Sequence, residues 1–289
     1  MSILAQQLRN LKIKPKWWGS LGMVESVVRY NCMKRGFPVP VLLLPFWEGA
    51  GNKAYEISGN MNHGALTNDP KWVAGMKGGN GILFDVLGSY INAGNDASIN
   101  NIPVIGIESW IYPKSSGQNG LGRIVDKVQK ILYVDTVNAP DVITFQHAFS
   151  TTTGIWRTYS GSLAPFYNQW LHLFLTYDNR STANIPYVYF NGILQGSFVL
   201  KGPVGTASSD SASSLLIGNR LDGIRTFDGM NDGVRIYNSP PTPAQIKFAA
   251  NNPYFMFETP EELWGPPPAG NWFLLQARNE LQGIRGING

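Results

Sequence analysis

The chain has little cysteine, little charge and no apolar segment long enough to cross a bilayer. Its single cysteine, Cys32, cannot form a disulfide within the chain, and no Cys/His spacing typical of a metal site is present. Charged residues make up 15% of the 289 residues, below the usual quarter. The longest apolar run, residues 39–47, contains two prolines and is too short for a membrane span. The sequence therefore predicts neither a disulfide scaffold nor membrane insertion.

The motifs of the common enzyme classes are also missing. The sequence contains no HExxH, GxSxG, P-loop or GxGxxG motif, and its three histidines are scattered. Glycoside hydrolysis needs two carboxylates aimed at one bond, and sandwich-fold glucanases carry theirs as alternating acids on one strand. Glu108 is a lone acid near that position, and the pair Glu261 and Glu262 falls in the C-terminal tail. We therefore expect that the protein is not an enzyme.

The net charge of +4 is concentrated at one end. Residues 1–40 contain seven basic residues against Glu25 and carry +6, so the remaining residues sum to −2. Such an arm suits an anionic protein surface, a membrane surface or nucleic acid, or it is simply solvated. The first residues lack the apolar stretch and the small-residue cleavage site of a signal peptide, which predicts a protein made in a cytoplasm.

Glycine, asparagine and aromatic residues are plentiful, and they divide the chain into many short strands. The sequence contains 32 glycines, and aromatic residues make up 12% of it. About ten β-rich runs with turn residues between them predict a sandwich or a barrel. We divide the chain into a basic N-terminal arm (1–40), a strand-rich body (41–252) and a Pro-rich C-terminal tail (253–289).

Two local signals in the body predict specific structures. Asn191-Gly192 between two apolar runs predicts a type I′ hairpin, because both turn positions need a positive φ. Thr242, Pro243 and Gln245 form the N-terminal signature of a short helix, in which Thr242 and Gln245 cap each other's backbone. The body is therefore predicted to be all β with one short helix.

Both ends of the chain carry aromatic residues outside the body. Leucine and isoleucine spacing predicts a short amphipathic helix at 2–12, and an adjacent tryptophan pair follows it. A second apolar patch follows three prolines in the tail. Because exposed aromatic patches are unfavourable, we expect both ends to pack on the body or on a partner. The predicted docking residues are Trp17, Trp18, Arg9, Lys12, Lys14, Lys16, Trp272 and Phe273.

Seven blocks of the body occur in a characteristic order. They are LPFWEGAGNKAYEISGNMNHGAL (44–66), GILFDVLGSYINAG (81–94), IGIESWIYP (105–113), WLHLFLTYD (170–178), YVYFNGILQG (187–196), LLIGNR (215–220) and FDGMNDGVRIYNSPPTPAQI (227–246). This series resembles the laminin-G-like (LamG, concanavalin-A-like lectin/glucanase) domain. The resemblance implies a two-sheet antiparallel jellyroll sandwich, usually non-catalytic, which here has arms at both ends.

Some members of the family bind Ca²⁺ at one rim of the sandwich, whereas the Asn, Asp and Gly residues of these loops are also those that tight turns need. Matched by motif, the rim oxygens would come from Glu56, Asn60, Asp228 and Asp232. Two departures bear on this site: the opening acid is Glu56 rather than Asp, and Gly233 replaces the second carboxylate of the family's Asp-Glu pair. No cofactor is required by this sequence, and calcium binding is left open.

Aromatic residues near predicted loops suggest a sugar-binding platform. Trp156, Tyr159, Phe166 and Tyr167 could stack on sugar rings, as Trp and Tyr faces do in sugar-binding proteins. The alternative is that these side chains fill the core of the sandwich.

The flanks give a second, weaker resemblance. A Trp-rich arm and the tail NNPYFMFETPEELWGPPP resemble virion proteins of tailed-phage structural clusters. The first hypothesis is therefore a non-catalytic virion structural protein, either a capsid decoration or a head or tail attachment subunit. Its partners would be other virion proteins and copies of itself, rather than nucleic acid. The alternative is a carbohydrate-binding, lectin-like adsorption module that binds surface glycans.

Overall fold

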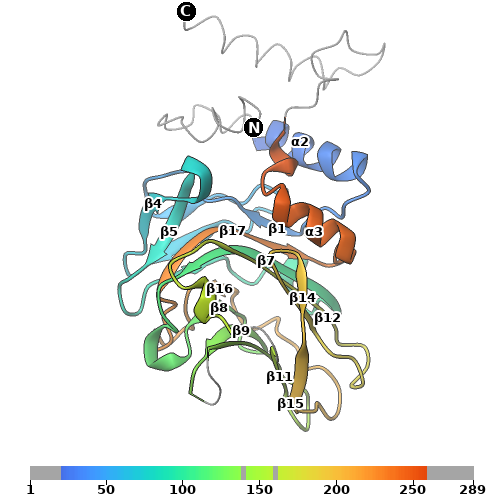
Figure 1. Ribbon diagram of the computed structural model, residues 1–289. Coiled ribbons are helices and arrows are strands. Elements are labelled where there is room, and N and C mark those ends of the chain that lie inside the picture. The colour runs from blue at the N-terminus through green and yellow to red at the C-terminus, as the bar shows by residue number, and fades with distance from the viewer. Residues whose placement is uncertain (1–20, 138–140, 159–161, 259–289) are drawn as a thin grey trace, which may run out of the picture.

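Two antiparallel sheets face each other in the computed structural model, which describes residues 21–137, 141–158 and 162–258 (Figure 1). Sheet A has the spatial order β14 (Ile193–Gln195), β13 (Tyr187–Phe190), β12 (Leu171–Asp178), β7 (Val104–Pro113), β17 (Gly229–Tyr237), β5 (Asn80–Phe84) and β4 (Lys71–Ala74), with β1 (Leu42–Leu44) beside β17. The predicted jellyroll sandwich is confirmed.

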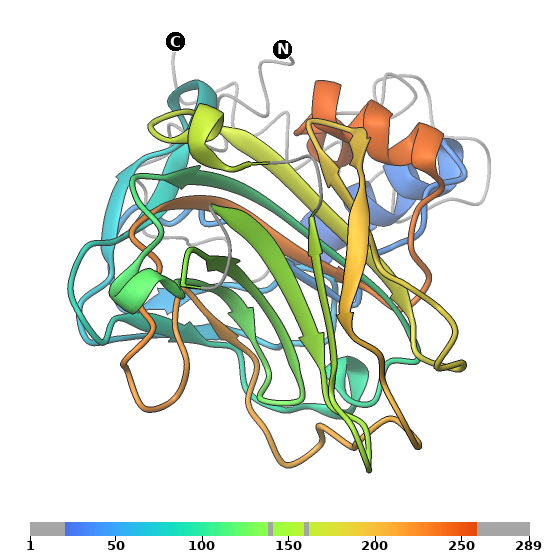
Figure 2. The same ribbon diagram turned by 60° about the horizontal axis from the view of Figure 1, so that its bottom comes forward.

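Sheet B lies beneath the arch of sheet A, and Figure 2 is turned to bring it forward. Its spatial order is β15 (Ser197–Lys201), β11 (Gly154–Thr158), β10 (Val142–His147), β9 (Lys130–Asp135), β8 (Arg123–Asp126), β16 (Leu216–Ile217), β6 (Tyr90–Asn92), β3 (Gly64–Thr67) and β2 (Lys53–Ala54). Consecutive strands often lie in different sheets, so the two sheets are tied together many times along the chain.

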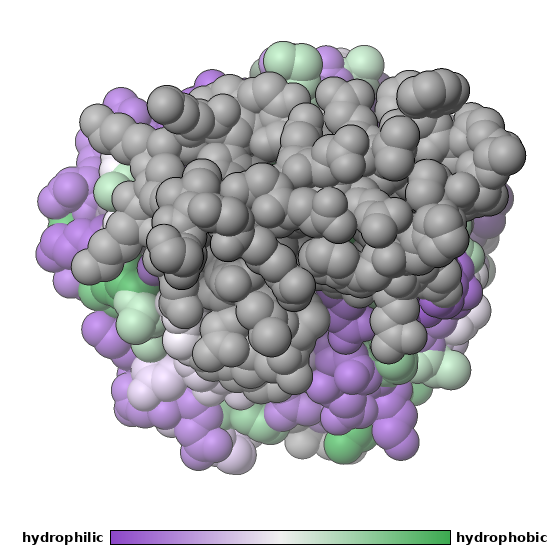
Figure 3. Space-filling view, turned by 90° about the horizontal axis from the view of Figure 1, so that it is seen from above, coloured by the Kyte–Doolittle hydropathy of each residue, from purple (hydrophilic) through white to green (hydrophobic). Residues whose placement is uncertain are grey.

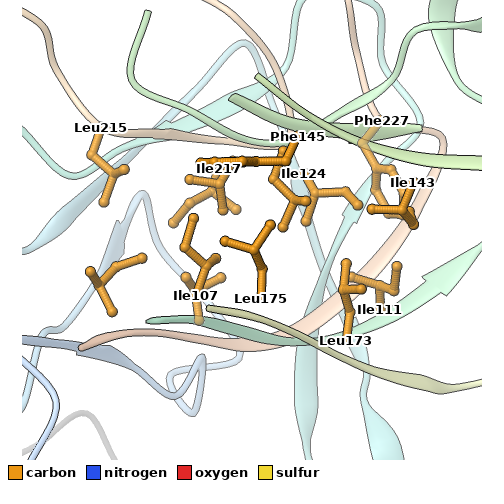
Figure 4. Packing of buried hydrophobic residues seen from close by; sticks show 14 of the residues in the cluster. Ile107, Ile111, Ile124, Ile143, Phe145, Leu173, Leu175, Leu215, Ile217 and Phe227 are labelled. Atoms are coloured by element: carbon orange, nitrogen blue, oxygen red, sulfur yellow. The ribbon is translucent and has the colours of Figure 1, made fainter. Parts of the chain in front are cut away.

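The core lies between the two sheets and follows from alternation along their strands. Successive side chains of a strand point to opposite faces, so every second residue of β7 and β12 points into the sandwich. Buried side chains of both sheets meet there, and each contributes on the order of 2 kcal/mol through burial. Figure 4 labels ten of them: Ile107, Ile111, Ile124, Ile143, Phe145, Leu173, Leu175, Leu215, Ile217 and Phe227.

The two local predictions are confirmed. Asn191 and Gly192 have φ values of 50° and 76° and connect β13 to β14. Helix α3 (Pro243–Asn251) begins after Thr242, whose side chain accepts from the backbone N–H of Gln245 while the Gln245 side chain accepts from Thr242 N–H.

A layer of helices covers the outer face of sheet A (Figure 1). It consists of α2 (Leu21–Lys34), α3 and the 3-10 turn η6 (Phe255–Phe257), and it buries a second apolar cluster that includes Val28, Cys32 and Phe255. Burial raises the pKa of the Cys32 thiol to about 12. The sequence analysis did not predict α2, and the helix expected at 2–12 lies outside the described residues.

No helix of the described ranges has the length and apolarity that a bilayer crossing requires. Seen from the helical side, the visible surface around the undescribed residues is mostly hydrophilic, with apolar side chains here and there (Figure 3). The buried cluster of the helical layer includes Phe174 and Tyr237 of sheet A, so the apolar side of the layer faces that sheet.

A buried polar network lies under the helical layer and includes Glu108. The Glu108 carboxylate accepts from His172 Nε2 (3.0 Å), from Tyr237 Oη (2.7 Å) and from Arg235 Nη1. Arg235 Nη2 also donates to the carbonyl of Pro253 at 2.8 Å. Burial alone would raise the pKa of Glu108, but Arg235 and the hydrogen bonds outweigh it and lower the pKa to about 2. Glu108, the acid that the sequence analysis compared with a glucanase position, thus binds Arg235, and Arg235 attaches the C-terminal segment to sheet A through Pro253.

Candidate functional site

The helices α2 and α3 cover sheet A, so the outer face of sheet B lies on the opposite side of the sandwich. The central strands of sheet B place polar residues on this outer face. On β9, Leu132 and Val134 point into the core, so Tyr133 and Asp135 point outward. The same alternation on β10 and β11 turns Phe145 and Trp156 inward and their neighbours outward. The outward positions of these strands are therefore where a ligand could meet sheet B.

Four outward side chains line up across four strands. Arg123 of β8 is paired with Tyr133, Tyr133 with Thr144 of β10, and Thr144 with Arg157 of β11. We call these four residues the arginine row. It continues onto Phe198 of β15, which is paired with Arg157. Cross-strand partners on one face are about 5 Å apart, so the row is a continuous transverse strip.

Ion pairs and a ring contact fix the arginine row. Arg157 Nη2 donates to Asp135 Oδ2 at 2.8 Å, and Thr144 Oγ1 donates to the same oxygen at 3.5 Å. At the other end, the Arg123 guanidinium lies 4.3 Å from the centre of the Tyr133 ring, and its Nε is 3.2 Å from Asp126 Oδ2. These contacts hold both guanidinium groups before any ligand arrives.

The row is shielded from solvent. Arg123 is 7% exposed and Arg157 is 6% exposed. Burial lowers the pKa of Arg123 and raises the pKa of Tyr133, and the nearby Asp135 raises the pKa of Tyr133 further. Arg220 and Arg225 add positive potential beside Arg123. Only a small part of each guanidinium and of the Tyr133 ring is therefore exposed, and a polar ligand would meet these groups in a partly dehydrated setting.

The carboxylates on this face are not arranged for glycoside hydrolysis. Asp126 is paired with Ile131, four residues from Asp135 along β9. At about 3.3 Å per residue this offset places the Cα atoms of Asp126 and Asp135 at least about 13 Å apart, and their carboxylates pair with different arginines, Arg123 and Arg157. Glycosidases hold their two carboxyl groups roughly 5–9.5 Å apart, aimed at one bond. Glu108 lies on the other sheet, on the face that the helical layer covers. The geometry of this face thus favours binding over hydrolysis.

The predicted sugar platform does not form as expected. Trp156 is 1% exposed and its ring lies in the core, 4.9 Å from the ring of Tyr177 and stacked near Phe145. The expectation for Trp156 is wrong, because an inward position on β11 turns the indole away from any surface. Tyr159 lies outside the described residues.

Phe166 and Tyr167 lie on the connection from β11 to β12 and are half-buried against the core. The Phe166 ring makes an edge contact with Phe190 at 5.5 Å, and Tyr167 Oη donates to Asp141 Oδ1 at 2.7 Å. These contacts give both side chains a structural role in this connection. Any sugar contact they make remains a prediction.

The four predicted calcium ligands do not converge. Glu56 accepts from the backbone N–H of Leu43 (3.1 Å) and of Ser58, and Asn60 donates to Val41 O at 2.7 Å. In the described ranges, no three His, Cys, Asp or Glu side chains are grouped closely enough to hold a metal ion. The motif match therefore misplaced the site: Glu56 and Asn60 attach their loop to the backbone around β1.

Asp228 and Asp232 have separate partners. Asp228 Oδ2 accepts from Ser115 Oγ at 2.7 Å. Asp232 Oδ2 accepts from Met76 N–H at 2.7 Å and from Tyr254 Oη at 3.3 Å. Both acids thus satisfy protein donors on different loops instead of sharing a cation.

An ammonium group occupies an oxygen-rich position at one end of the sandwich. Lys127 Nζ donates to Asn100 Oδ1 (2.7 Å), Ser213 O (2.7 Å) and Asp210 O (3.1 Å). Lys130 Nζ pairs with the carboxylate of the same Asp210. Both lysines are buried, and burial lowers the pKa of Lys127. This pair of lysines joins the connection from β6 to β7 to the connection from β15 to β16.

The predicted docking residues of the two arms all lie outside the described residues: Trp17, Trp18, Arg9, Lys12, Lys14, Lys16, Trp272 and Phe273. The arginine row, by contrast, was missed by the sequence analysis. A partial signal for it exists in KILYVD and GIWRT, where Tyr133 and Asp135 alternate with apolar residues and Arg157 follows Trp156. Reading which face each position takes would have separated Tyr133, Asp135 and Arg157 from the core.

A family model matches residues 85–247, more than half of the chain. The model is of the laminin G type and is described as the concanavalin A-like lectin/glucanases superfamily. The chain belongs to this superfamily. The matched range begins just after β5 and ends within α3, so it includes β7 to β17 and the whole arginine row. No curated protein sequence matches the chain.

Solved structures of the superfamily fold include two toxin binding domains. The binding domain of Paraclostridial Mosquitocidal Protein 1 is similar with a TM-score of 0.55 and 15% identity, over 74% of this chain and 52% of that one. The receptor binding domain of botulinum neurotoxin C/D mosaic serotype has a TM-score of 0.54 and 14% identity, over 74% and 51%. The chain thus spans about half the length of these two domains, and the likeness is one of fold.

Proposed function

We propose that the protein is a non-catalytic binding module that uses the outer face of sheet B to bind a glycan. The observation that carries this proposal is the arginine row, a strip of guanidinium, phenol and hydroxyl groups across four strands of one sheet. Membership of a lectin/glucanase superfamily supports a saccharide as the ligand class, although a fold alone does not fix a function.

The chemistry of the row suits an oxygen-rich ligand. Each guanidinium offers several N–H donors in a fixed plane, and its ion pair keeps it in place, so little side-chain entropy is lost on binding. The Tyr133 ring packs against the Arg123 guanidinium and adds an aromatic, apolar element to the row. The wide separation of Asp126 and Asp135 supports binding without cleavage.

A glycan array followed by isothermal titration of the full chain tests the proposal. We expect Arg123→Lys to weaken binding of the selected glycan by about 10-fold or more, because Lys keeps the charge but loses the planar donor set. Arg180→Lys is the matched control, since Arg180 pairs with Asp178 on an exposed turn. If no glycan binds, or if both variants bind as well as the parent, the proposal fails.

A second candidate function, a structural subunit of a virion, is favoured by the way the first and last described segments meet. Asn31 Nδ2 donates to the carbonyls of Met256 (3.1 Å) and Glu258 (2.7 Å), and Arg35 forms an ion pair with Glu258. The C-terminal end of α2 and the segment after η6 thus pack together in the layer on sheet A. Two arms that extend from one layer would attach the module by one side and present sheet B on the other.

This second proposal is tested by immunogold electron microscopy of particles released from producing cells. We expect the chain on a capsid or tail, and we expect Trp17→Ala and Trp272→Ala, made in the full chain, to reduce labelling. Tyr55→Phe on the sandwich is the control and should label normally. Particles without label, or arm variants that label like the parent, would rule out the attachment role.

A further inference from the structure

One side of the sandwich has an unusual concentration of exposed apolar residues. Of the large hydrophobic side chains that are exposed in the described ranges, half fall between residues 185 and 204. In this stretch Lys201 is the sole charged residue. The members are Ile185, Tyr187, Ile193, Leu194, Phe198, Val199, Leu200 and Val204. We call this set the edge patch.

Five of the eight members of the edge patch lie on the terminal strands of the two sheets. Strand β14 ends sheet A and β15 ends sheet B, and Gly196 alone separates them in the sequence. Figure 1 shows the two strands along one side of the molecule. On β15 the consecutive residues Phe198, Val199 and Leu200 are 37%, 47% and 47% exposed, so apolar side chains are accessible on both faces of the strand.

A terminal strand with this composition is a site for association. Such a strand offers backbone N–H and C=O groups to another strand, and proteins usually protect it with charges, prolines or bulges. Here Lys201 and Pro203 stand at the end of β15, and a bulge lies at Leu200 in the pairing with β11. The side chains of Val199 and Leu200 nevertheless remain 47% exposed. Contiguous exposed apolar surface of this kind marks interaction sites on soluble proteins.

We propose that the edge patch is a homodimer interface in which β15 of one copy packs antiparallel to β15 of a second copy. The sequence of the strand, SFVLK, is complementary to itself in this arrangement. With Val199 on the twofold axis, Phe198 faces Leu200 of the second copy and Lys201 faces Ser197. The two lysines lie at opposite ends, so the contact brings no like charges together.

A twofold contact between two copies fits this surface better than a head-to-tail contact between copies. A twofold contact uses the same patch on both partners and closes, whereas a head-to-tail contact leaves one patch uncovered and continues into a fibre. The interface lies at the side of the sandwich, next to the end of the arginine row at Phe198. Dimerisation and glycan binding are measured separately, by sedimentation and by titration, so each proposal can fail without the other.

Sedimentation equilibrium of the full chain tests the interface with a charge pair. Val199→Lys places two ammonium groups at the axis, and Val199→Glu places two carboxylates there. We expect each variant alone to dimerise at least about 10-fold more weakly than the parent, because like charges across an interface are strongly unfavourable. An equimolar mixture of the two variants is expected to recover the dimer as a mixed pair.

Leu221→Lys serves as the matched control, since Leu221 is an apolar residue that is also exposed, at 68%, on a loop outside the edge patch. This variant is expected to associate like the parent, and circular dichroism of all variants checks that the fold is kept. A parent that stays monomeric, or Val199 variants that associate like the parent, overturns the proposal. So does a mixture that associates no better than its components, because the contact is then with something other than a second β15.

Discussion

Arg157 reaches from β11 across β10 to donate to Asp135 of β9, with 2.8 Å between Nη2 and Oδ2. The contact passes over Thr144, which donates to the same carboxylate. Arg157 is 6% exposed and Asp135 is wholly buried. The pair therefore ties three neighbouring strands together on the face that we propose for ligand binding, and its loss has a measurable cost.

We expect Asp135→Ala to lower the free energy of unfolding by about 3–5 kcal/mol, because it leaves the Arg157 charge buried without its carboxylate. Asp222→Ala is the control. It removes the partner of Arg220 from an exposed pair and should cost no more than about 1 kcal/mol. Urea unfolding followed by fluorescence measures both values. Equal losses of unfolding free energy in the two variants would show that the buried pair stabilises the fold no more than the exposed pair does.

The Glu108 network predicts how stability depends on pH. The folded-state pKa of Glu108 is lowered from 4.5 to about 2, so the folded protein binds the proton less readily than the unfolded chain. The resulting stabilisation, about 3 kcal/mol, is complete above pH 4.5 and is lost as the pH falls toward 2.

Glu108→Gln should therefore be less stable than the parent near neutral pH, and the difference should shrink between pH 4.5 and pH 2. Glu25→Gln is a suitable comparison, because Glu25 forms an ion pair with Arg29 at the edge of α2. Thermal unfolding at a series of pH values measures the difference. A gap between parent and Glu108→Gln that stays constant down to pH 2 would contradict the assignment.

The hydrogen bonds of the Lys127 ammonium group predict that this internal cation stabilises the loops around Asn100 and Asp210. Lys127→Met should cost about 2–4 kcal/mol, because three buried oxygens lose a charged donor. Lys71→Met, which removes a more exposed pair with Asp85, should cost much less. Addition of calcium or of a chelator should leave the unfolding temperature of the parent unchanged. A chelator-sensitive parent would restore the calcium hypothesis.

The β13–β14 turn makes a prediction about backbone geometry. Gly192 has a φ of 76°, and a Cβ built there would lie 2.7 Å from Lys247 Cα in helix α3. Gly192→Ala should therefore destabilise the protein by more than the 1–2 kcal/mol that a positive φ alone costs. Gly51→Ala isolates that cost, since Gly51 has a φ of 89° and no atom near its Cβ position. Equal losses in denaturant unfolding would mean that α3 moves aside.

The sequence predicted those parts of the fold whose cause is local. Asn191 and Gly192 require their turn because of their backbone preferences, and Thr242 with Gln245 caps α3 through neighbouring atoms. Helix α2 was missed because most of its stabilisation comes from Tyr237, Phe255 and other residues distant in the sequence.

The candidate site was less accessible to sequence reasoning. Arg123 and Arg157 are brought into one row by the pairing of four strands, and that pairing is set by the whole sandwich. Trp156 was assigned to a sugar-binding platform because tryptophan rings stack on sugars. Its position on β11, however, decides that the ring points into the core. The calcium motif failed for a related reason, since Asp228 and Asp232 match the family by spacing and have other donors in this fold.

Cys32 is the one thiol of the chain, and it is buried where α2 packs on sheet A. A thiol reagent can reach it when the helix lifts, so the rate of alkylation reports how often the layer detaches. Compared with the rate of global unfolding, that rate tells whether the layer opens as a unit of its own. Alkylation of Cys32 therefore measures how often the helical layer opens, and it does so without any added label.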